Sequence, residues 1–237
     1  MIDLSCLGGN KNILNIFNIL RYKRAFAKEH PGYFRPDGLL IFCGAQGEGK
    51  TLSAVDYVKK LSWDYPRAII CTNVEIKGLN PLCKVVEYQG LESLTSIENG
   101  YYGVIYLIDE IHLEFNSLES KNIPIEVMIE VSQQRKQRKH IVGTSQQFMR
   151  LAKPLREQVK NLVICRKMFG CMQFNKLIDG STITERDGHI RMEVKKRCIW
   201  FHSPEMYDSY DTYKKMRRYR EEWQGVSRSS IYSDINV

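Results

Sequence analysis

The sequence predicts an α/β fold, with a mostly parallel sheet flanked by helices and then a small C-terminal antiparallel hairpin and helix. Short apolar runs alternate with helical stretches over residues 38–167, as in sheets whose parallel strands are joined by crossover helices. A glycine-rich turn links the first apolar run to a helix. Beyond residue 169, the turn signals Asp179-Gly180 and Asp187-Gly188 favour antiparallel strands.

Size and composition are those of a soluble globular protein. The chain has 237 residues, of which 43% are hydrophobic and 26% are charged, and this length can bury a full core. No apolar run approaches the 18 residues that a membrane-spanning helix needs. Asp3 precedes the first basic cluster, which is the wrong order for a secretory signal.

Cysteine usage predicts a reducing compartment and no zinc site. The seven cysteines form no C-x-x-C pair, and Cys43, Cys71 and Cys165 fall in predicted strands, where cysteine acts as a small buried hydrophobe. The segment His112-Leu113-Glu114 lacks the spacing of two metal ligands on one helix face, so we expect a structural role for His112.

The chain before residue 38 is predicted to be an amphipathic helix followed by an irregular connector. The helix covers residues 11–20 and gathers apolar side chains on one face, namely Ile13, Ile16, Phe17 and Leu20. That face could pack on the core, dock a partner or touch a membrane surface. The connector carries Pro31, Gly32, Pro36 and Gly38.

The core is expected to alternate strands and helices in chain order. Strands are predicted at residues 39–43, 67–72, 102–108, 140–144 and 161–165, and helices at 52–61, 91–97, 125–139 and 154–160. Residues 74–84 are predicted to be a loop or extended segment. The helix after Pro124 is expected to turn Ile125, Met128 and Ile129 inward, with Ser132 as a fourth candidate.

The C-terminal part is expected to complete the domain. Antiparallel strands are predicted at residues 170–174 and 188–201, followed by a helix from about Pro204 to Trp223. The predicted division is an N-terminal helical extension (1–36), a P-loop core (37–168), a hairpin and helix (169–224) and a flexible tail (225–237).

The glycine-rich turn is predicted to bind the phosphates of a nucleotide. It reads Gly44-Ala45-Gln46-Gly47-Glu48-Gly49-Lys50-Thr51 and, with Leu52, forms the predicted nucleotide-binding set. Glycines let the backbone N–H groups point inward, and the helix N-terminus adds partial positive charge. Lys50 can reach the β- and γ-phosphates, and the Thr51 hydroxyl can hold Mg²⁺. The predicted cofactors are ATP and Mg²⁺.

A pair of acids supplies the second half of the predicted site. The apolar run Tyr106-Leu107-Ile108 ends in Asp109-Glu110, which places both carboxylates at the sheet edge beside the phosphate loop. Asp109 is predicted to hold the metal and its waters with Thr51. Glu110 is predicted to activate the attacking water, so the pair favours hydrolysis over transfer to an alcohol.

Three further catalytic candidates follow in the chain. Gln146, ahead of Gln147, comes just after a predicted strand and could sense the γ-phosphate, although an ordinary turn amide is the alternative. Arg135 and Arg138 could each reach a neighbouring subunit's nucleotide, contact DNA or remain solvated. Arg156 is a third candidate for the role in trans.

The net charge of +8 is concentrated in two regions, which suits a polyanion although such runs are often solvated faces. Between Gln133 and Lys160 there are eight Lys or Arg and one acid, Glu157. The predicted DNA-binding residues in this region are Arg135, Lys136, Lys139, Arg150 and Lys153. The second cluster is Lys214, Lys215, Arg217, Arg218 and Arg220.

Several stretches occur in a recognisable order: Gly44–Thr51, Val104–Glu110, Gln133–His140 and Gly143-Thr144-Ser145-Gln146. This order resembles phage ATPases of the zonular-occludens-toxin-like family, within the FtsK/HerA superfamily of DNA-pumping motors. Ser203-Pro204-Glu205 and Tyr210-Asp211-Thr212-Tyr213 resemble the element that closes that domain. The resemblance covers about residues 36–215.

The resemblance implies a RecA-like core of the additional-strand, catalytic-glutamate type, in a hexameric or pentameric ring that couples ATP hydrolysis to DNA movement. Family members in filamentous phages assist export of single-stranded DNA, and superfamily members in other phages package DNA. This sequence lacks the transmembrane segment usual in filamentous phages, which favours a packaging or transfer motor. The implied partners are DNA, further copies of the chain and capsid or portal proteins, in the host cytoplasm or with the virion.

Two other interpretations of the function remain open. A nucleotide-switched helicase loader or DNA-binding regulator of the AAA+ kind would bind DNA without translocating. An assembly protein would bind nucleotide without turnover, although Lys50, Thr51, Asp109 and Glu110 are all present. A small-molecule kinase is the least favoured, because no lid-like arginine cluster accompanies a substrate pocket.

Overall fold

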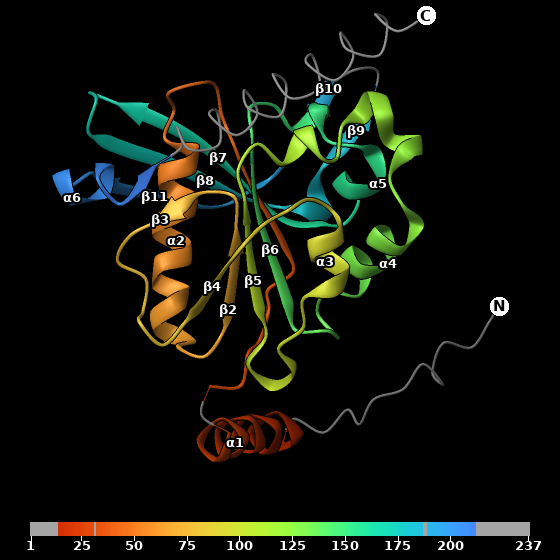
Figure 1. Cartoon of the computed structure of the whole chain (residues 1–237), viewed down its shortest axis with the longest axis vertical. Helices are drawn as coiled ribbons and strands as arrows, with labels where there is room; N and C mark the ends of the chain where they lie inside the picture. The colour runs from red at the N-terminus through yellow and green to blue at the C-terminus, as the bar shows by residue number, and fades with distance from the viewer. Residues whose placement is uncertain (1–13, 31, 187–188, 212–237) are drawn as a thin grey trace, which may run out of the picture. The chain divides into compact units, whose positions relative to one another are not determined.

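The computed structural model in Figure 1 describes residues 14–30, 32–186 and 189–211. The chain divides into two compact units, residues 1–33 and 34–237. The first unit contains helix α1 (Leu14–Glu29), which continues past the predicted end at Leu20, whereas residues 11–13 of the predicted helix lie outside the described residues. Ile16, Phe17 and Leu20 of the predicted apolar face are 57%, 63% and 47% exposed, and Ile13 lies outside the described residues.

An eight-stranded sheet forms the centre of the second unit, in the order β11-β8-β7-β1-β6-β5-β2-β4. The strands from β7 to β4 pair in parallel, whereas β8 and β11 extend the sheet in antiparallel fashion. Their bounds are β1 (Leu39–Cys43), β2 (Ile69–Thr72), β4 (Lys84–Glu87), β5 (Val104–Ile108), β6 (Lys139–Ser145), β7 (Val159–Met168), β8 (Met172–Asp179) and β11 (Val194–Phe201).

The order of the central strands is that of the predicted additional-strand fold. Strand β6 lies between β1, which leads into the phosphate loop, and β5, which ends before Asp109. Because the three strands are parallel, their carboxyl ends meet at one edge of the sheet. The predicted fold class is confirmed.

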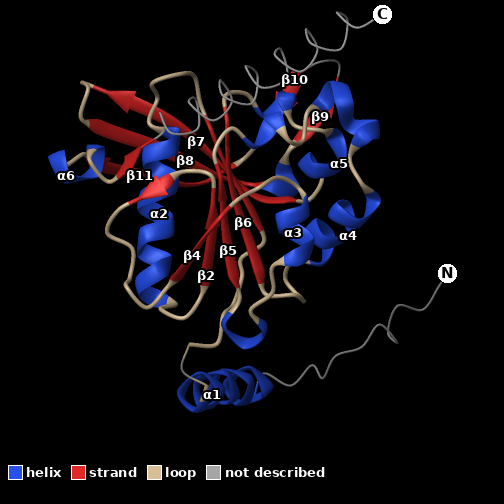
Figure 2. Ribbon diagram, viewed as in Figure 1, coloured by secondary structure: helices blue, strands red, loops and turns tan. Residues whose placement is uncertain are grey.

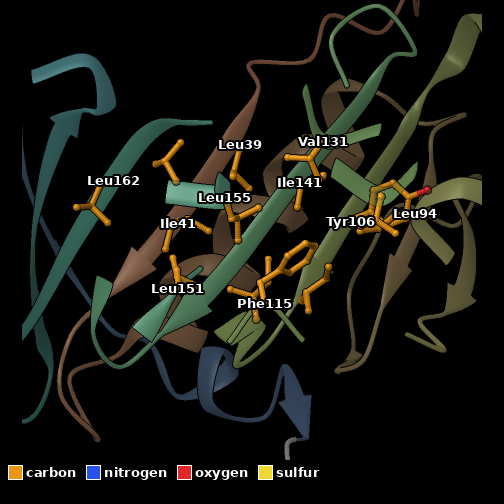
Figure 3. Close-up of a cluster of buried hydrophobic side chains, with 14 of the residues drawn as sticks. Leu39, Ile41, Leu94, Tyr106, Phe115, Val131, Ile141, Leu151, Leu155 and Leu162 are labelled. Carbon is orange, nitrogen blue, oxygen red and sulfur yellow. The ribbon is translucent and has the colours of Figure 1, made fainter. Parts of the chain in front are cut away.

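Helices cover both faces of the sheet (Figure 2). Helix α2 (Lys50–Asp64) packs Ala54, Val55 and Val58 against one face. The helices α3 (Glu92–Ser96), α4 (Ile125–Gln133) and α5 (Lys153–Arg156) cover the other. Figure 3 shows this second core, in which Leu94, Val131 and Leu155 from the helices surround Tyr106 and Ile141 of the sheet. Burial of these apolar side chains is the main stabilising term.

Smaller elements complete the second unit. Strand β3 (Glu75–Ile76) pairs with β12 (Tyr210–Asp211), and β9 (Thr184–Arg186) pairs with β10 (His189–Arg191). The one-turn helix α6 (Pro204–Tyr207) lies between β11 and β12. The helices of the described ranges 14–30, 32–186 and 189–211 are all too short or too polar to cross a membrane.

The predicted inward face of α4 is wrong in part, because Met128 packs against the core whereas Ile125, Ile129 and Ser132 are exposed. Ile125 and Ile129 are 70% and 47% exposed, whereas Val127 and Val131 are buried. The helix also ends at Gln133 rather than near Lys139. A turn follows in which Arg138 takes a left-handed backbone (φ 55°), and Lys139 already belongs to β6.

The C-terminal prediction was also wrong in part. Instead of a helix from Pro204 to Trp223, α6 ends at Tyr207 and the chain pairs Tyr210 with Ile76 of β3. The reason is tertiary, because the Ser209 carbonyl accepts a 2.7 Å hydrogen bond from the Lys77 N–H. Residues 212–223 of the predicted helix, the second basic cluster and the predicted tail lie outside the described residues.

Cys43, Cys71 and Cys165 lie in strands and are buried, as predicted. Burial raises the pKa of each of these thiols to about 12, so they stay protonated and unreactive at neutral pH.

Candidate functional site

The phosphate loop joins β1 to α2, and the close approach of other chain segments explains its glycines. A Cβ atom on Gly44 would lie 2.7 Å from the Cys165 carbonyl oxygen, and one on Gly49 would lie 2.2 Å from Oε1 of Gln173. Gly49 also has a left-handed φ of 77° at the start of α2. Only glycine fits both positions without displacing β7 or β8.

Lys50 lies at the first turn of α2 and is 6% exposed. Its Nζ donates a 3.1 Å hydrogen bond to the Ala45 carbonyl oxygen, so the ammonium group lies over the loop. The loop residues Ala45, Gln46 and Gly47 are exposed. Backbone N–H groups and a lysine at a helix start are the groups that bind phosphate.

Thr51 and Asp109 come together although they are far apart in sequence. The Thr51 hydroxyl donates to Oδ1 of Asp109 at 2.9 Å, and the Thr144 hydroxyl donates to the same oxygen at 2.7 Å. Asp109 is 7% exposed. A hydroxyl beside a carboxylate is the oxygen ligand pair that Mg²⁺ takes in phosphoryl-transfer sites, so these two residues fit the expected metal.

The backbone around Asp109 is fixed by Asn73 and Thr144, neither of which was predicted as a site residue. The Asn73 side chain accepts from the Asp109 N–H at 2.8 Å and donates to the Asp109 carbonyl at 3.1 Å. The Thr144 hydroxyl accepts from the Glu110 N–H at 2.9 Å. Only Thr144 had a signal, because it lies in the Gly143-Thr144-Ser145-Gln146 motif. Asn73 had none.

The Glu110 carboxylate is positioned to accept a further hydrogen bond. It takes a left-handed backbone with φ 52° and ψ 47°. Its Oε2 atom is buried and accepts no hydrogen bond from the described residues, although Nδ1 of His112 lies 3.2 Å away. A buried acceptor without a donor calls for a functional explanation. His112 is 8% exposed, and its role stays a prediction.

A cavity of about 210 Å³ lies over the phosphate loop. One wall is the loop and the start of α2, including Gly49, Lys50 and Thr51. The other wall comes from Lys167 at the end of β7 and from His202, Tyr207 and Tyr210 in the segment after β11. None of these four residues was predicted to belong to the site.

Gln146 lies at the same sheet edge but does not line the cavity. It follows the carboxyl end of β6 and accepts a 3.3 Å hydrogen bond from Nη1 of Arg150. Its role as a γ-phosphate sensor stays a prediction.

The remaining predicted residues fall at two ends of β6. Arg135, Lys136 and Arg138 precede its amino end, at the edge of the sheet opposite the phosphate loop, whereas Arg150 follows its carboxyl end. Arg135 and Arg138 therefore do not reach the nucleotide site of their own subunit. Arg156 lies at the end of α5, 3.7 Å from Glu185. These predicted catalytic and DNA-binding residues therefore do not form one site.

Lys139 was wrongly predicted to bind DNA. The residue is 1% exposed. Its Nζ donates to Oε2 of Glu130 at 2.7 Å and to the Leu94 carbonyl at 2.8 Å. Because its charge is already paired inside the core, it has no surface to offer a phosphate backbone.

Comparison with known proteins gives a likeness in structure but none in sequence. No protein-family model and no curated protein matches the chain. The N-terminal domain of zonular occludens toxin from Neisseria meningitidis aligns with a TM-score of 0.52 and 18% identity, over 73% of this chain and 98% of that one. The genome-packaging NTPase B204 from Sulfolobus turreted icosahedral virus 2 aligns with a TM-score of 0.49 and 11% identity, over 66% of this chain and 96% of that one.

Proposed function

This chain has the P-loop fold of the zonular occludens toxin N-terminal domain, and on that premise we propose that it hydrolyses ATP to move DNA. The observation that carries hydrolysis is Glu110, which follows the acid that contacts Thr51 and has a buried carboxylate oxygen that accepts no hydrogen bond from the described residues. A general base positioned beside a phosphate loop activates water. The cell-biological setting that we propose is packaging or transfer of a phage or mobile-element genome in the host cytoplasm.

The site residues have separate proposed roles in ATP binding and hydrolysis. The loop Gly44–Thr51 and the first turn of α2 bind the phosphates, and Lys50 exchanges its Ala45 contact for the γ-phosphate. Thr51 and Asp109 would hold Mg²⁺, which neutralises charge on the phosphate oxygens when bound. Glu110 accepts a proton from the attacking water, while Thr144 holds the Glu110 N–H and Asn73 holds the Asp109 N–H in place.

DNA movement needs a link from the nucleotide to a DNA contact, and the Gln146–Arg150 hydrogen bond supports one. Gln146 lies at the nucleotide edge of the sheet, and Arg150 is exposed. A shift of Gln146 on hydrolysis would move a cation on the surface. Arg135 and Arg138, at the opposite edge, are assigned to a neighbouring subunit's nucleotide in a hexameric or pentameric ring, and capsid or portal proteins are proposed as its partners.

The first test is steady-state ATPase activity of the full chain with and without single- or double-stranded DNA. Glu110→Gln should lower kcat by about 10²-fold or more, the usual loss of a general base, while ATP binding persists. Glu119→Gln, an exposed acid on the surface, is the control and should keep full activity. Turnover that survives Glu110→Gln would remove Glu110 from the mechanism.

Paired charge variants locate the DNA contact. Arg150→Ala with Lys153→Ala should lower DNA stimulation of the ATPase and leave the basal rate unchanged. Lys23→Ala with Arg24→Ala, which removes the same charge from two exposed residues of α1, is the control and should leave DNA stimulation in place. An ATP hydrolysis rate that neither form of DNA changes would favour a nucleotide-switched loader or regulator. ATP binding without hydrolysis would favour an assembly protein.

A further inference from the structure

We propose that Tyr207, with His202 and Lys167, forms the pocket for the base of the nucleotide. The inference rests on the proposed ATP binding and adds to it a site for the aromatic base. These three residues line the cavity over the phosphate loop and belong to none of the motifs that bind phosphate or metal.

The position of the three residues separates the base from the phosphates and the metal. The metal-binding acid Asp109 follows β5, which lies on one side of β1, beyond β6. Lys167 lies one residue before the end of β7, and His202 follows β11, both on the other side of β1. A nucleotide whose γ-phosphate faces Asp109 therefore extends its base toward Tyr207.

The pocket wall is tied directly to the phosphate loop. Gln173 is fully buried, and its Nε2 donates to the Glu48 carbonyl oxygen in the loop and to Oδ1 of Asn175, both at 2.9 Å. These bonds turn Oε1 of Gln173 toward Nε2 of His202, 3.2 Å away. The Glu48 carboxylate accepts a 2.6 Å hydrogen bond from the Lys167 N–H. Loop and wall are thus held as one rigid unit.

Tyr207 is anchored through its hydroxyl group and is half-exposed. The hydroxyl lies 2.6 Å from Nδ1 of His202 and 3.1 Å from the Gly170 carbonyl oxygen. The residue is 48% exposed, and the ring lines the cavity at an edge-on angle to the His202 ring, 5.4 Å between centroids. An anchored, half-exposed aromatic ring at the wall of a cavity can serve as a stacking platform for a base.

The test compares two ligands that share phosphates but differ in the base. Binding of ATP and of inorganic tripolyphosphate to the full chain is measured by calorimetry for wild type, Tyr207→Ala and Tyr207→Phe. Tyr207→Ala should raise the Kd for ATP about tenfold, within the range of single base–aromatic stacks, and leave the Kd for tripolyphosphate unchanged. Tyr207→Phe keeps the ring and should retain most of the ATP affinity.

The control is Trp63→Ala, which removes an exposed aromatic ring near the far end of α2 and should change neither Kd. An unchanged ATP affinity in Tyr207→Ala, or an equal loss for both ligands, would overturn the base pocket. Wild-type protein that binds neither ligand would instead overturn the proposed ATP binding itself, so the two failures are distinct.

Discussion

At the scale of single residues, Glu110 combines a strained backbone with the position of a catalytic base. Its left-handed φ of 52° costs a residue with a side chain about 1–2 kcal/mol. The structure holds it there through the hydrogen bond from the Glu110 N–H to the Thr144 hydroxyl. Strain of this kind persists where function requires it.

Replacement of Glu110 should therefore separate stability from activity. Glu110→Gly should raise the free energy of unfolding by about 1 kcal/mol, because glycine accepts the left-handed backbone, and should abolish hydrolysis. Urea unfolding and ATPase assays measure the two effects. Glu119→Gly, at a residue with φ −113°, is the matched control and should destabilise; a loss of stability in Glu110→Gly would contradict the strain.

The sequence predicted residues whose roles follow from local spacing and missed those that depend on tertiary contact. The loop from Gly44 to Thr51 and the acids at the end of β5 lie together as their motifs implied. Asn73 and Tyr207 reach the site only because β2 and the segment after β11 come to the same edge of the sheet. Lys139 shows the opposite error, because a basic run does not reveal which of its members is buried.

At the scale of elements, β6 carries a neutral histidine into the core. Nδ1 of His140 lies 2.7 Å from the Gly38 carbonyl oxygen, which only accepts, so Nδ1 carries the proton and Nε2 accepts from the Tyr57 hydroxyl at 3.1 Å. Burial lowers the pKa of His140 from 6.5 to about 4. The folded protein thus resists protonation of this ring.

This histidine should make the protein sensitive to mild acid. Between pH 6.5 and 4 the unfolded chain binds a proton at His140 that the native chain does not, so stability is complete above pH 6.5 and falls as the pH drops. The loss should reach about 3 kcal/mol near pH 4. Urea unfolding across this range should give a flatter pH dependence for His140→Gln; equal slopes would mean that His140 does not control it.

The ends of helices and strands were predictable where the local hydrophobic pattern was strong and no tertiary contact competed with it. The strands β1 and β5 are continuous apolar runs, and their ends lie where predicted or within two residues. Strand β4 was missed because Lys84–Glu87 is short and largely exposed and is recognisable only by its pairing with β2. The predicted C-terminal helix gave way because pairing of Tyr210 with Ile76 competes with helix formation.

At the scale of the whole molecule, both hydrophobic cores come from the second unit. Among the described residues, no member of either core precedes Phe34. A chain that starts at Phe34 should keep its free energy of unfolding within about 0.5 kcal/mol and bind ATP as the full chain does. Urea unfolding and calorimetry check this. A large loss of stability would show that residues 1–33 contribute to the core.

The position of β1 at the middle of the sheet also sets an order of events during synthesis. Its two neighbours, β6 and β7, are made of residues 139–145 and 159–168. The phosphate loop therefore leaves the ribosome long before either flanking strand exists. At roughly 5–20 residues per second, it waits on the order of ten seconds, and a nascent chain gains a nucleotide site only after residues 159–168 have been made.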